Sequence, residues 1–481
     1  MDAATSSRLP RRPALGASSE RSNVQQAPRA VLGVGAAVAI IVGIVVGAGI
    51  FKAPSMVAGL SGGAGWMFAA WAVGGLVSLV GALCYAELAS AYPDTGGDYH
   101  FLRLAYGRHV AFLFAWARFA VITTGSIALL GFVFGDYMQQ LLPLGAHGEA
   151  LYAVAAIVAL AAVNLRGLRS GAATQGGLTL LEVAGLLLIV AAGLWLLLGG
   201  TAAPPAPAAP AEPAGWGSLG MAMVFVLLTY GGWNEAAYLS AEIKEDPLRR
   251  GRRLRLALLL SIGAITALYL LVNWAYWQGL GLAGMARSEA IAADLLRSAF
   301  GEAGAVLVAA VVALAALTSI NATLIVGART TCALGRDWRA LRRLGDWDAE
   351  RGTPRVALLA QTLAALALVA LGAAAQDGFR AMVEFTAPVF WLFFLLAGVS
   401  LFVLRRKDPR TERPCPVPLY PWLPALFVAV CAGMLASSLS YVGSQTLGGF
   451  NAAWIGVAVL ATGALLMALL PRSTPPARRT R

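Results

Sequence analysis

Long apolar stretches, separated by short polar or Gly/Pro-containing turns, fill the chain from Val31 to Leu470. A helix needs about 20 mainly apolar residues to cross a bilayer, and stretches of that length recur along the whole sequence. We therefore expect an all-α integral membrane protein with twelve transmembrane helices. The pattern places them at residues 31–59, 66–91, 107–141, 149–166, 172–199, 216–243, 253–279, 301–330, 355–375, 379–404, 419–441 and 449–470.

The remaining residues fit tails and connections of a single domain over residues 31–470. Residues 1–30 are polar, hold five arginines and contain no apolar core of a secretory signal peptide, which predicts a disordered tail. A second tail covers residues 471–481. The Pro/Ala-rich run from Thr201 is typical of a linker between two helices. Apolar positions at near-helical spacing predict a short amphipathic helix over residues 287–300.

The charges favour membrane topology over nucleic-acid binding. Only 12% of the 481 residues are charged, about half the share in a soluble chain, although the net charge is +12. If residues 1–30 lie inside, 31 of the 36 Lys and Arg residues fall on the inner side and 3 on the outer side. This distribution follows the positive-inside rule. It predicts a multi-pass protein of the inner or plasma membrane with both termini in the cytoplasm.

Residues suited to enzymatic chemistry are scarce. The four cysteines are scattered and form no CxxC pattern, and the three histidines lie near predicted loops or helix ends. No lysine stands in a GxxxxGK[ST] phosphate loop. We expect no metal site, no cofactor and no ATP hydrolysis, and therefore not an enzyme.

Two predicted helices carry glycine clusters where a spanning helix is normally smooth. One runs from Gly43 to Phe51 in the first helix, and the other from Thr229 to Trp233 in the sixth. Interrupted helices at corresponding places in two halves of a chain point to the binding site of inverted-repeat transporters. Unwound backbone is tolerated at membrane depth where it lines a cavity or binds a ligand. The alternative is that Gly43 and Gly47 form a small-residue packing face.

A small zwitterion suits such a pair of breaks. Free N–H groups at the start of a half-helix attract a carboxylate, and free carbonyl groups hold an ammonium group. Neither charge of the ligand then needs a charged side chain as its partner.

Several motifs resemble one family, the amino acid-polyamine-organocation superfamily, particularly its L-type amino acid transporter branch. The resemblance covers about residues 31–335, and its most specific part runs from the second helix into the following loop. The motif residues are Gly47–Phe51; Tyr85–Leu88 with Pro93, Gly96, Gly97, Tyr99, Leu102, Ala105 and Gly107; Tyr230–Asn234 with Ala241–Lys244 and Pro247; and Ser319–Asn321.

This resemblance implies a five-plus-five inverted-repeat fold, with repeats at about 31–199 and 216–375, extra helices at 379–470, and transport of an amino acid by alternating access. It implies that Ala48, Gly49 and Ile50 meet the substrate carboxylate. It likewise implies that the amino group meets Thr229, Tyr230 and Gly231. No nearby side chain imposes an obvious charge preference, which favours a neutral amino acid carried by proton coupling or exchange.

Two residues are candidates for gates. Glu87 and the loop after it are candidates for the cytoplasmic gate, although Glu87 can instead pair with Arg103 or Arg108. In many relatives an aromatic residue covers the substrate two positions before the tyrosine of the sixth helix. Here that position is Leu228, so gating by ring stacking is in doubt.

Charged and hydroxyl side chains within the predicted helices suggest coupling sites. Relatives often carry a lysine where this chain has Glu182. Because burial favours the protonated form of a carboxyl group, Glu182 is a candidate to exchange a proton, or else a permanently protonated structural residue. Thr318 and Ser319 are candidate sodium ligands, although such hydroxyl groups more often bond to helix backbone. Arg118 either snorkels or pairs with a carboxylate such as Glu182 or Glu235, or contacts an acidic substrate.

Other functions stay open. A polyamine or other organic-cation permease of the same superfamily needs acidic side chains in its pocket, for which Glu182 and Glu235 are the near candidates. A channel or membrane-embedded enzyme fits less well, because the sequence shows neither a filter motif nor a catalytic cluster. The expected partners are the substrate, protons and the lipid bilayer. The sequence identifies no partner subunit.

Overall fold

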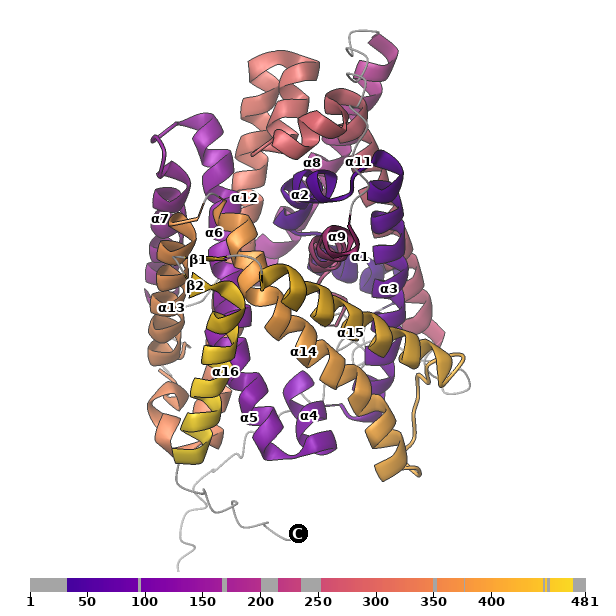
Figure 1. Ribbon diagram of the computed structural model, residues 1–481, viewed down its shortest axis with the longest axis vertical. Coiled ribbons are helices and arrows are strands. Elements are labelled where there is room, and N and C mark those ends of the chain that lie inside the picture. The colour runs from indigo at the N-terminus through magenta and orange to yellow at the C-terminus, as the bar shows by residue number, and fades with distance from the viewer. Residues whose placement is uncertain are drawn as a thin grey trace, which may run out of the picture.

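The computed structural model describes residues 33–93, 97–166, 171–199, 215–234, 252–348, 353–375, 377–443, 446–447 and 450–469. These form a helical bundle (Figure 1). Nine helices of this part of the chain are long and apolar enough to cross a membrane, and two shorter apolar helices accompany them. The helices are α1 (Val34–Val45), α2 (Ala53–Leu60), α3 (Ala64–Ala91), α4 (Asp98–Tyr106), α5 (Arg108–Ala117), α6 (Thr124–Leu141), α7 (Gly148–Arg166), α8 (Gly171–Gly199), α9 (Trp216–Thr229), α11 (Arg252–Arg287), α12 (Ile291–Asp337), α13 (Arg355–Ala373), α14 (Gly378–Lys407), α15 (Trp422–Val442) and α16 (Ala452–Leu469).

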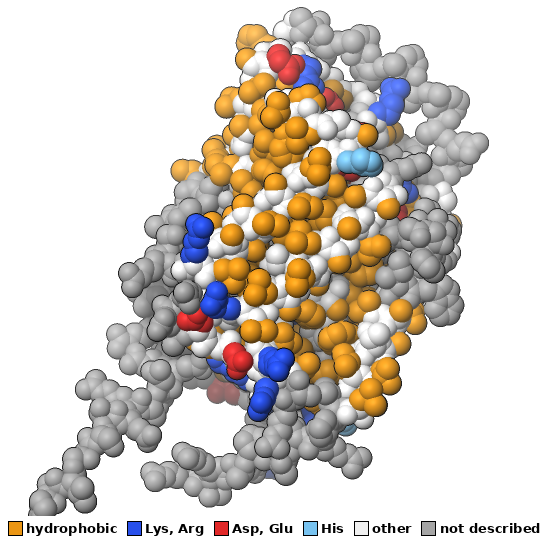
Figure 2. All heavy atoms as spheres, turned by 90° about the vertical axis from the view of Figure 1, so that its left-hand side faces the viewer, with side chains coloured by type: hydrophobic (Ala, Val, Ile, Leu, Met, Phe, Trp, Pro, Cys, Tyr) orange, Lys and Arg blue, Asp and Glu red, His pale blue; other side chains and the backbone are white. Residues whose placement is uncertain are grey.

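The outer surface of the bundle is apolar. Exposed leucine and valine side chains cover α7, among them Leu151, Val154 and Val158, and α13 carries Leu359 and Leu363 in the same way. On the face shown in Figure 2, hydrophobic side chains form a broad middle band, and most charged side chains lie toward the two ends. A surface of this kind is solvated by lipid. The protein is therefore a multi-pass membrane protein.

Small residues let the helices approach closely. A side chain at Gly135 on α6 would collide with the backbone of Glu149 on α7, and one at Gly193 on α8 would collide with the backbone of Ala275 on α11. In lipid, close packing of this kind takes over much of the role that burial from water has in soluble proteins. The contact at Gly135 holds α6, which carries part of the site described below, against α7.

Three elements differ from the sequence prediction. The loop after α3 contains the short helix α4, which was not predicted because its apolar residues are too few to span a membrane. The predicted short helix near residues 287–300 forms as the first part of α12, up to a kink at Gly301 with φ +70°. A small antiparallel strand pair, β1 (Thr446–Leu447) and β2 (Phe450–Asn451), which the sequence did not predict, precedes α16 and leaves the all-helical class unchanged.

Candidate functional site

A cavity of about 1160 Å³ lies inside the bundle and extends toward the end that carries α4, where Asp98 lines it. It reaches inward to the place where α1 and α9 stop. Polar groups and aromatic rings both line it, from α1, α3, α4, α5, α6, α8, α9, α12 and α14, from the turn that joins α5 to α6 and from the turn after α9. The lining residues include Gly43, Val46, Gly47, Tyr85, Asp98, Phe114, Arg118, Thr123, Ser126, Glu182, Leu228, Gly231, Gly232, Asn234, Ser319, Thr323, Phe390, Phe393 and Phe394.

The first predicted helix is broken, as its glycines indicated. α1 ends at Val45, and the next two residues are extended, with φ −140° and ψ −177° at Gly47. A short 3₁₀ helix, η1 (Ala48–Phe51), follows and leads into α2. The first amides of a helix have no partner inside that helix. Residues Ala48 to Ile50 therefore present backbone N–H groups at the break.

The sixth predicted helix is interrupted as well. α9 ends at Thr229, and Tyr230, Gly231 and Gly232 form a turn in which Gly232 has φ +101°, a conformation that favours glycine. The two breaks face each other, since a Cβ atom on Gly49 would lie 3.6 Å from the Thr229 side chain. Freed amides of one break and freed carbonyls of the other are thus brought together at the inner end of the cavity.

Tyr269 on α11 connects the two breaks, and sequence reasoning missed it. Its buried hydroxyl lies 3.4 Å from the Val45 carbonyl oxygen, at the end of α1, and 3.4 Å from the Thr229 carbonyl oxygen, at the end of α9. The ring packs on Trp71 and Tyr230, with centroids 5.7 Å and 5.0 Å away. No local signal marked it, because it is a tyrosine on a regular apolar helix.

The predicted binding residues divide between the cavity wall and the layer behind it. Leu228 and Gly231 line the cavity, as do Glu182 and Ser319. Ala48, Ile50, Thr229 and Tyr230 are buried at the breaks, and Gly49 lies against Thr229. Thr318 is not among the lining residues, and its hydroxyl donates to the Leu314 carbonyl oxygen at 2.9 Å. The structure therefore places Ser319, but not Thr318, at the cavity.

Both charged residues singled out within the helices, Glu182 on α8 and Arg118, line this cavity. Arg118 begins a π-helical turn, η2 (Arg118–Thr123), between α5 and α6. Turns of this type are frequent at functional sites. Glu235, Ala241–Lys244 and Pro247, which were also singled out in the sequence, lie outside the described residues.

Glu87 does not pair with Arg103 or Arg108. Its buried carboxylate accepts two hydrogen bonds from Arg405 on α14, at 2.7 Å and 2.6 Å, and one from the Val417 backbone N–H at 2.7 Å. The Arg413 guanidinium lies 3.3 Å away. These partners lie more than 300 residues farther along the chain than Glu87. A pairing inferred from arginines near Glu87 in the sequence was therefore wrong.

Where the cavity reaches α4, this helix is fastened to the end of α12. The Tyr99 hydroxyl donates to the Asp337 carboxylate at 2.9 Å. Burial and then the nearby Asp337 carboxylate raise the pKa of Tyr99 to about 12, so the phenol holds the proton of this bond more firmly than an exposed tyrosine does. Asp98, the first residue of α4, lines the cavity.

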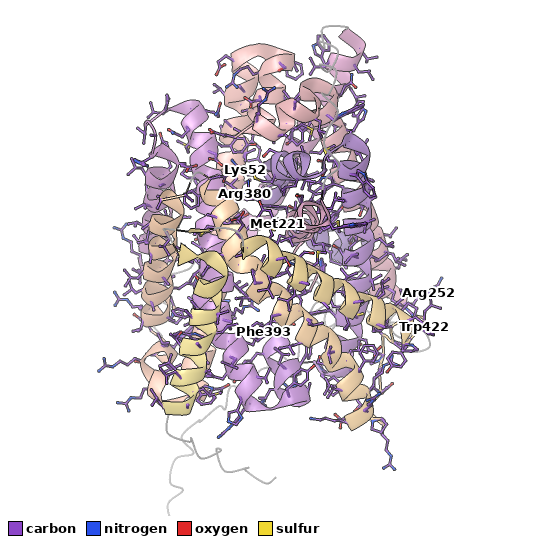
Figure 3. All side chains as sticks on the ribbon, viewed as in Figure 1. Lys52, Met221, Arg252, Arg380, Phe393 and Trp422 are labelled. Carbon is purple, nitrogen blue, oxygen red and sulfur yellow. The ribbon has the colours of Figure 1, made fainter. Side chains whose placement is uncertain are left out.

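A buried ion pair lies on the other side of the breaks. The Lys52 ammonium nitrogen, directly after η1, is 2.8 Å from an Asp136 carboxylate oxygen on α6. In Figure 3, Lys52 lies above the level of Met221 on α9, whereas the cavity residue Phe393 lies below it. Among the described residues no cluster of His, Cys, Asp and Glu is arranged to hold a metal ion.

A lipid-facing helical bundle with two broken helices around an internal cavity defines a membrane transport protein. The family model for amino acid permeases matches residues 32–460, and the chain belongs to that family. It is a transporter and not an enzyme.

Curated relatives agree with this assignment. The b(0,+)-type amino acid transporter 1 of Homo sapiens is 28% identical over 413 residues, covering 83% of this chain and 82% of the relative. The serine/threonine exchanger SteT of Bacillus subtilis (strain 168) is 26% identical over 409 residues, covering 84% and 90%. The large neutral amino acids transporter small subunit 2 of Mus musculus is 28% identical over 419 residues, covering 85% and 76%.

Proposed function

We propose that the chain is a secondary transporter that carries a neutral amino acid by alternating access. The observation that carries this proposal is the meeting of two helix breaks at the inner end of a cavity, with Gly49 packed against Thr229. In the proposed complex, backbone N–H groups of Ala48, Gly49 and Ile50 hold the carboxylate. Backbone carbonyl groups at Thr229, Tyr230 and Gly231 hold the ammonium group.

The finer architecture is part of the proposal. The broken first helix, nine long helices and two shorter ones fit twelve spans, arranged as two inverted five-helix repeats and two further helices. The α4 end also carries the basic end of α14, from Arg405 to Lys407. This end is therefore assigned to the cytoplasm, with both termini, by the positive-inside rule. The cavity then corresponds to a conformation open to the cytoplasm.

Two observations favour a neutral substrate. The names of two relatives refer to serine and threonine and to large neutral amino acids. Arg118 lines the cavity together with Glu182 and Asp98, so that the wall offers groups of both signs and suits a zwitterion better than a ligand that carries positive charge alone. This weighs against the polyamine alternative.

Glu182 is the proposed coupling residue. Its position on the cavity wall gives its carboxyl group access to the substrate path, which a proton carrier requires. The alternative is obligatory exchange, the activity named for the Bacillus subtilis relative. Ser319 is the better placed of the two proposed ion ligands.

Leu228 and Glu87 remain the proposed gate residues. Leu228 lies on the cavity wall immediately before the sixth-helix break, where its side chain can cover a bound substrate. Glu87 acts through the contacts that hold α3 to α14, so its part in gating is to anchor and not to move.

Transport by purified protein in liposomes tests this function. Labelled amino acids and putrescine are offered with and without an imposed proton gradient, to the wild type, to Glu182→Gln and to the exposed-site control Glu302→Gln. We expect saturable counterflow of a neutral amino acid, and a gradient-driven accumulation that Glu182→Gln abolishes while exchange survives. If neither the gradient nor Glu182→Gln has an effect, the protein is an exchanger and Glu182 is structural. If no amino acid is transported, or if putrescine alone is, the proposed function is wrong.

A further inference from the structure

Lys52 lies on the side of the breaks opposite the cavity. This residue precedes α2, and its ammonium group lies 2.8 Å from Asp136 of α6. Both side chains are at most 5% exposed. The same ammonium group donates to the Glu289 carbonyl oxygen, between α11 and α12, at 3.0 Å. A single cation therefore ties three separate elements together.

Tyr137, the neighbour of Asp136, strengthens the same junction. Its hydroxyl donates to the Phe51 carbonyl oxygen, the last of η1, at 2.6 Å, and accepts from the Ala292 backbone N–H at 3.3 Å. The cavity lining contains residues of α1 but, within the described chain, none of α2. The junction thus lies on the far side of the break from the cavity.

We propose that Lys52 is a positioning residue for substrate binding: its ion pair with Asp136 pins η1 and α2 to α6 while the cavity is open at the α4 end. The inference rests on the proposed function, because η1 supplies the amides assigned to the substrate carboxylate. In alternating access the opposite end must open to admit substrate, and Lys52 and Asp136 then separate. The pair both holds the binding turn in place and keeps that end shut.

The energetics of buried ion pairs give this proposal a specific signature. Removing one partner leaves an uncompensated charge and is strongly unfavourable, whereas replacing both with apolar residues is often neutral or stabilising. In the closed arrangement the lone charge is buried, but in the opened arrangement water can solvate it. Single substitutions therefore shift the population toward opening, and an apolar double substitution reverses that shift.

Carboxylates near the pair set the design of the variants. Asp377, before α14, and Glu149, on α7, both lie within electrostatic range of Lys52. Lys52→Met leaves several acidic groups without their cation, whereas Asp136→Asn leaves the lysine two weaker partners. We expect the effect of Lys52→Met to be the larger.

Thiol accessibility of Ala292→Cys measures opening at this junction. Ala292 is fully buried beside Tyr137, and the four native cysteines are buried as well, so a parent without Ala292→Cys gives the background. The variants Lys52→Met, Asp136→Asn, Lys52→Met/Asp136→Leu and the charge exchange Lys52→Asp/Asp136→Lys are compared in purified full-length protein. Arg287→Met, which removes an exposed arginine at the same end that bonds a carbonyl oxygen of its own helix, is the control.

We expect each single substitution to raise the rate of thiol modification by at least about tenfold. The apolar double variant returns the rate to within about twofold of the parent, and the control leaves it unchanged. The charge exchange partly restores the closed state. Unchanged modification in both single variants overturns the proposal, as does an apolar double variant that is as reactive as the single ones.

Substrate affinity distinguishes a positioning role from a merely structural one, because a structural role alone would leave the KM unchanged. In counterflow, we expect Lys52→Met to raise the KM by at least about fivefold with a smaller change in maximal rate, and the apolar double variant to recover most of the affinity. A single variant that opens but keeps the wild-type KM would refute positioning. Thiol modification does not depend on any substrate. It therefore tests the role of the ion pair even if the proposed transport function is wrong.

Discussion

Asp136 and Glu87 are both buried carboxylates in ion pairs, but they lie at opposite ends of the bundle and are held very differently. Asp136 meets one cation, Lys52, across the break in the first helix. Glu87 receives Arg405 at both oxygens, Arg413, and the Val417 amide. A carboxylate with one charged partner can be released by one separation. A carboxylate that is held by several donors is released only when all of these bonds break, so it acts as an anchor.

The largest expected effect is on this anchor. Glu87→Gln removes the countercharge of two partly buried arginines, so we expect it to lower the free energy of unfolding by about 3 kcal/mol or more. Thermal unfolding of the purified protein measures the loss. Glu384→Gln, which breaks the partly exposed pair with Arg380, is the control, and we expect a much smaller change. A Glu87→Gln protein with wild-type stability but an altered transport rate would instead make Glu87 a moving gate.

A smaller effect is expected at the end of the bundle that holds the Lys52–Asp136 pair. Tyr137→Phe keeps the ring but removes the hydroxyl bonded to Phe51 and Ala292, a loss of about 1 to 2 kcal/mol in the closed arrangement. We expect thiol modification of Ala292→Cys to rise several-fold, but less than in Lys52→Met. Tyr152→Phe, which loses one exposed hydrogen bond on α7, should leave the rate unchanged. Equal effects in Tyr137→Phe and Lys52→Met would mean that the hydroxyl, not the ion pair, closes this end.

The smallest expected effect tests whether Glu87 is redundantly held. Arg413→Gln removes the longest of its contacts, at 3.3 Å, while Arg405 and Val417 remain. We expect a loss of less than about 1 kcal/mol in thermal unfolding. A loss as large as that of Glu87→Gln would show that the network works as one cooperative unit, and the contrast with Asp136 would then weaken.

Local signals account for what the sequence predicted well. Apolar stretches mark the helices because lipid imposes length and composition on each span. The glycines around Gly47 and Gly231 marked both breaks for a similarly local reason, since glycine adopts backbone conformations that interrupt a helix.

Long-range pairings account for what was missed. Lys52 was read as a residue within a helix, yet its partner is on α6, and the partners of Glu87 are on and beyond α14. Tyr269 joins two breaks from a third helix. Periodicity assigns a residue to a face of its own helix, but it does not tell which distant helix covers that face. These contacts depend on tertiary packing, which no spacing within one helix encodes.

The π-helical turn η2 sets the helical register of α5, which lines the cavity, relative to α6. Such a turn accommodates one residue more than an α-helical turn. Moving the surplus residue along the helix would rotate α5 by about 100° and slide it by about 1.5 Å relative to α6. Arg118 would then take another direction about the helix axis, while Asp136, farther along α6, kept its place. One helix can thus present two different linings to a substrate without disturbing the ion pair at its other end.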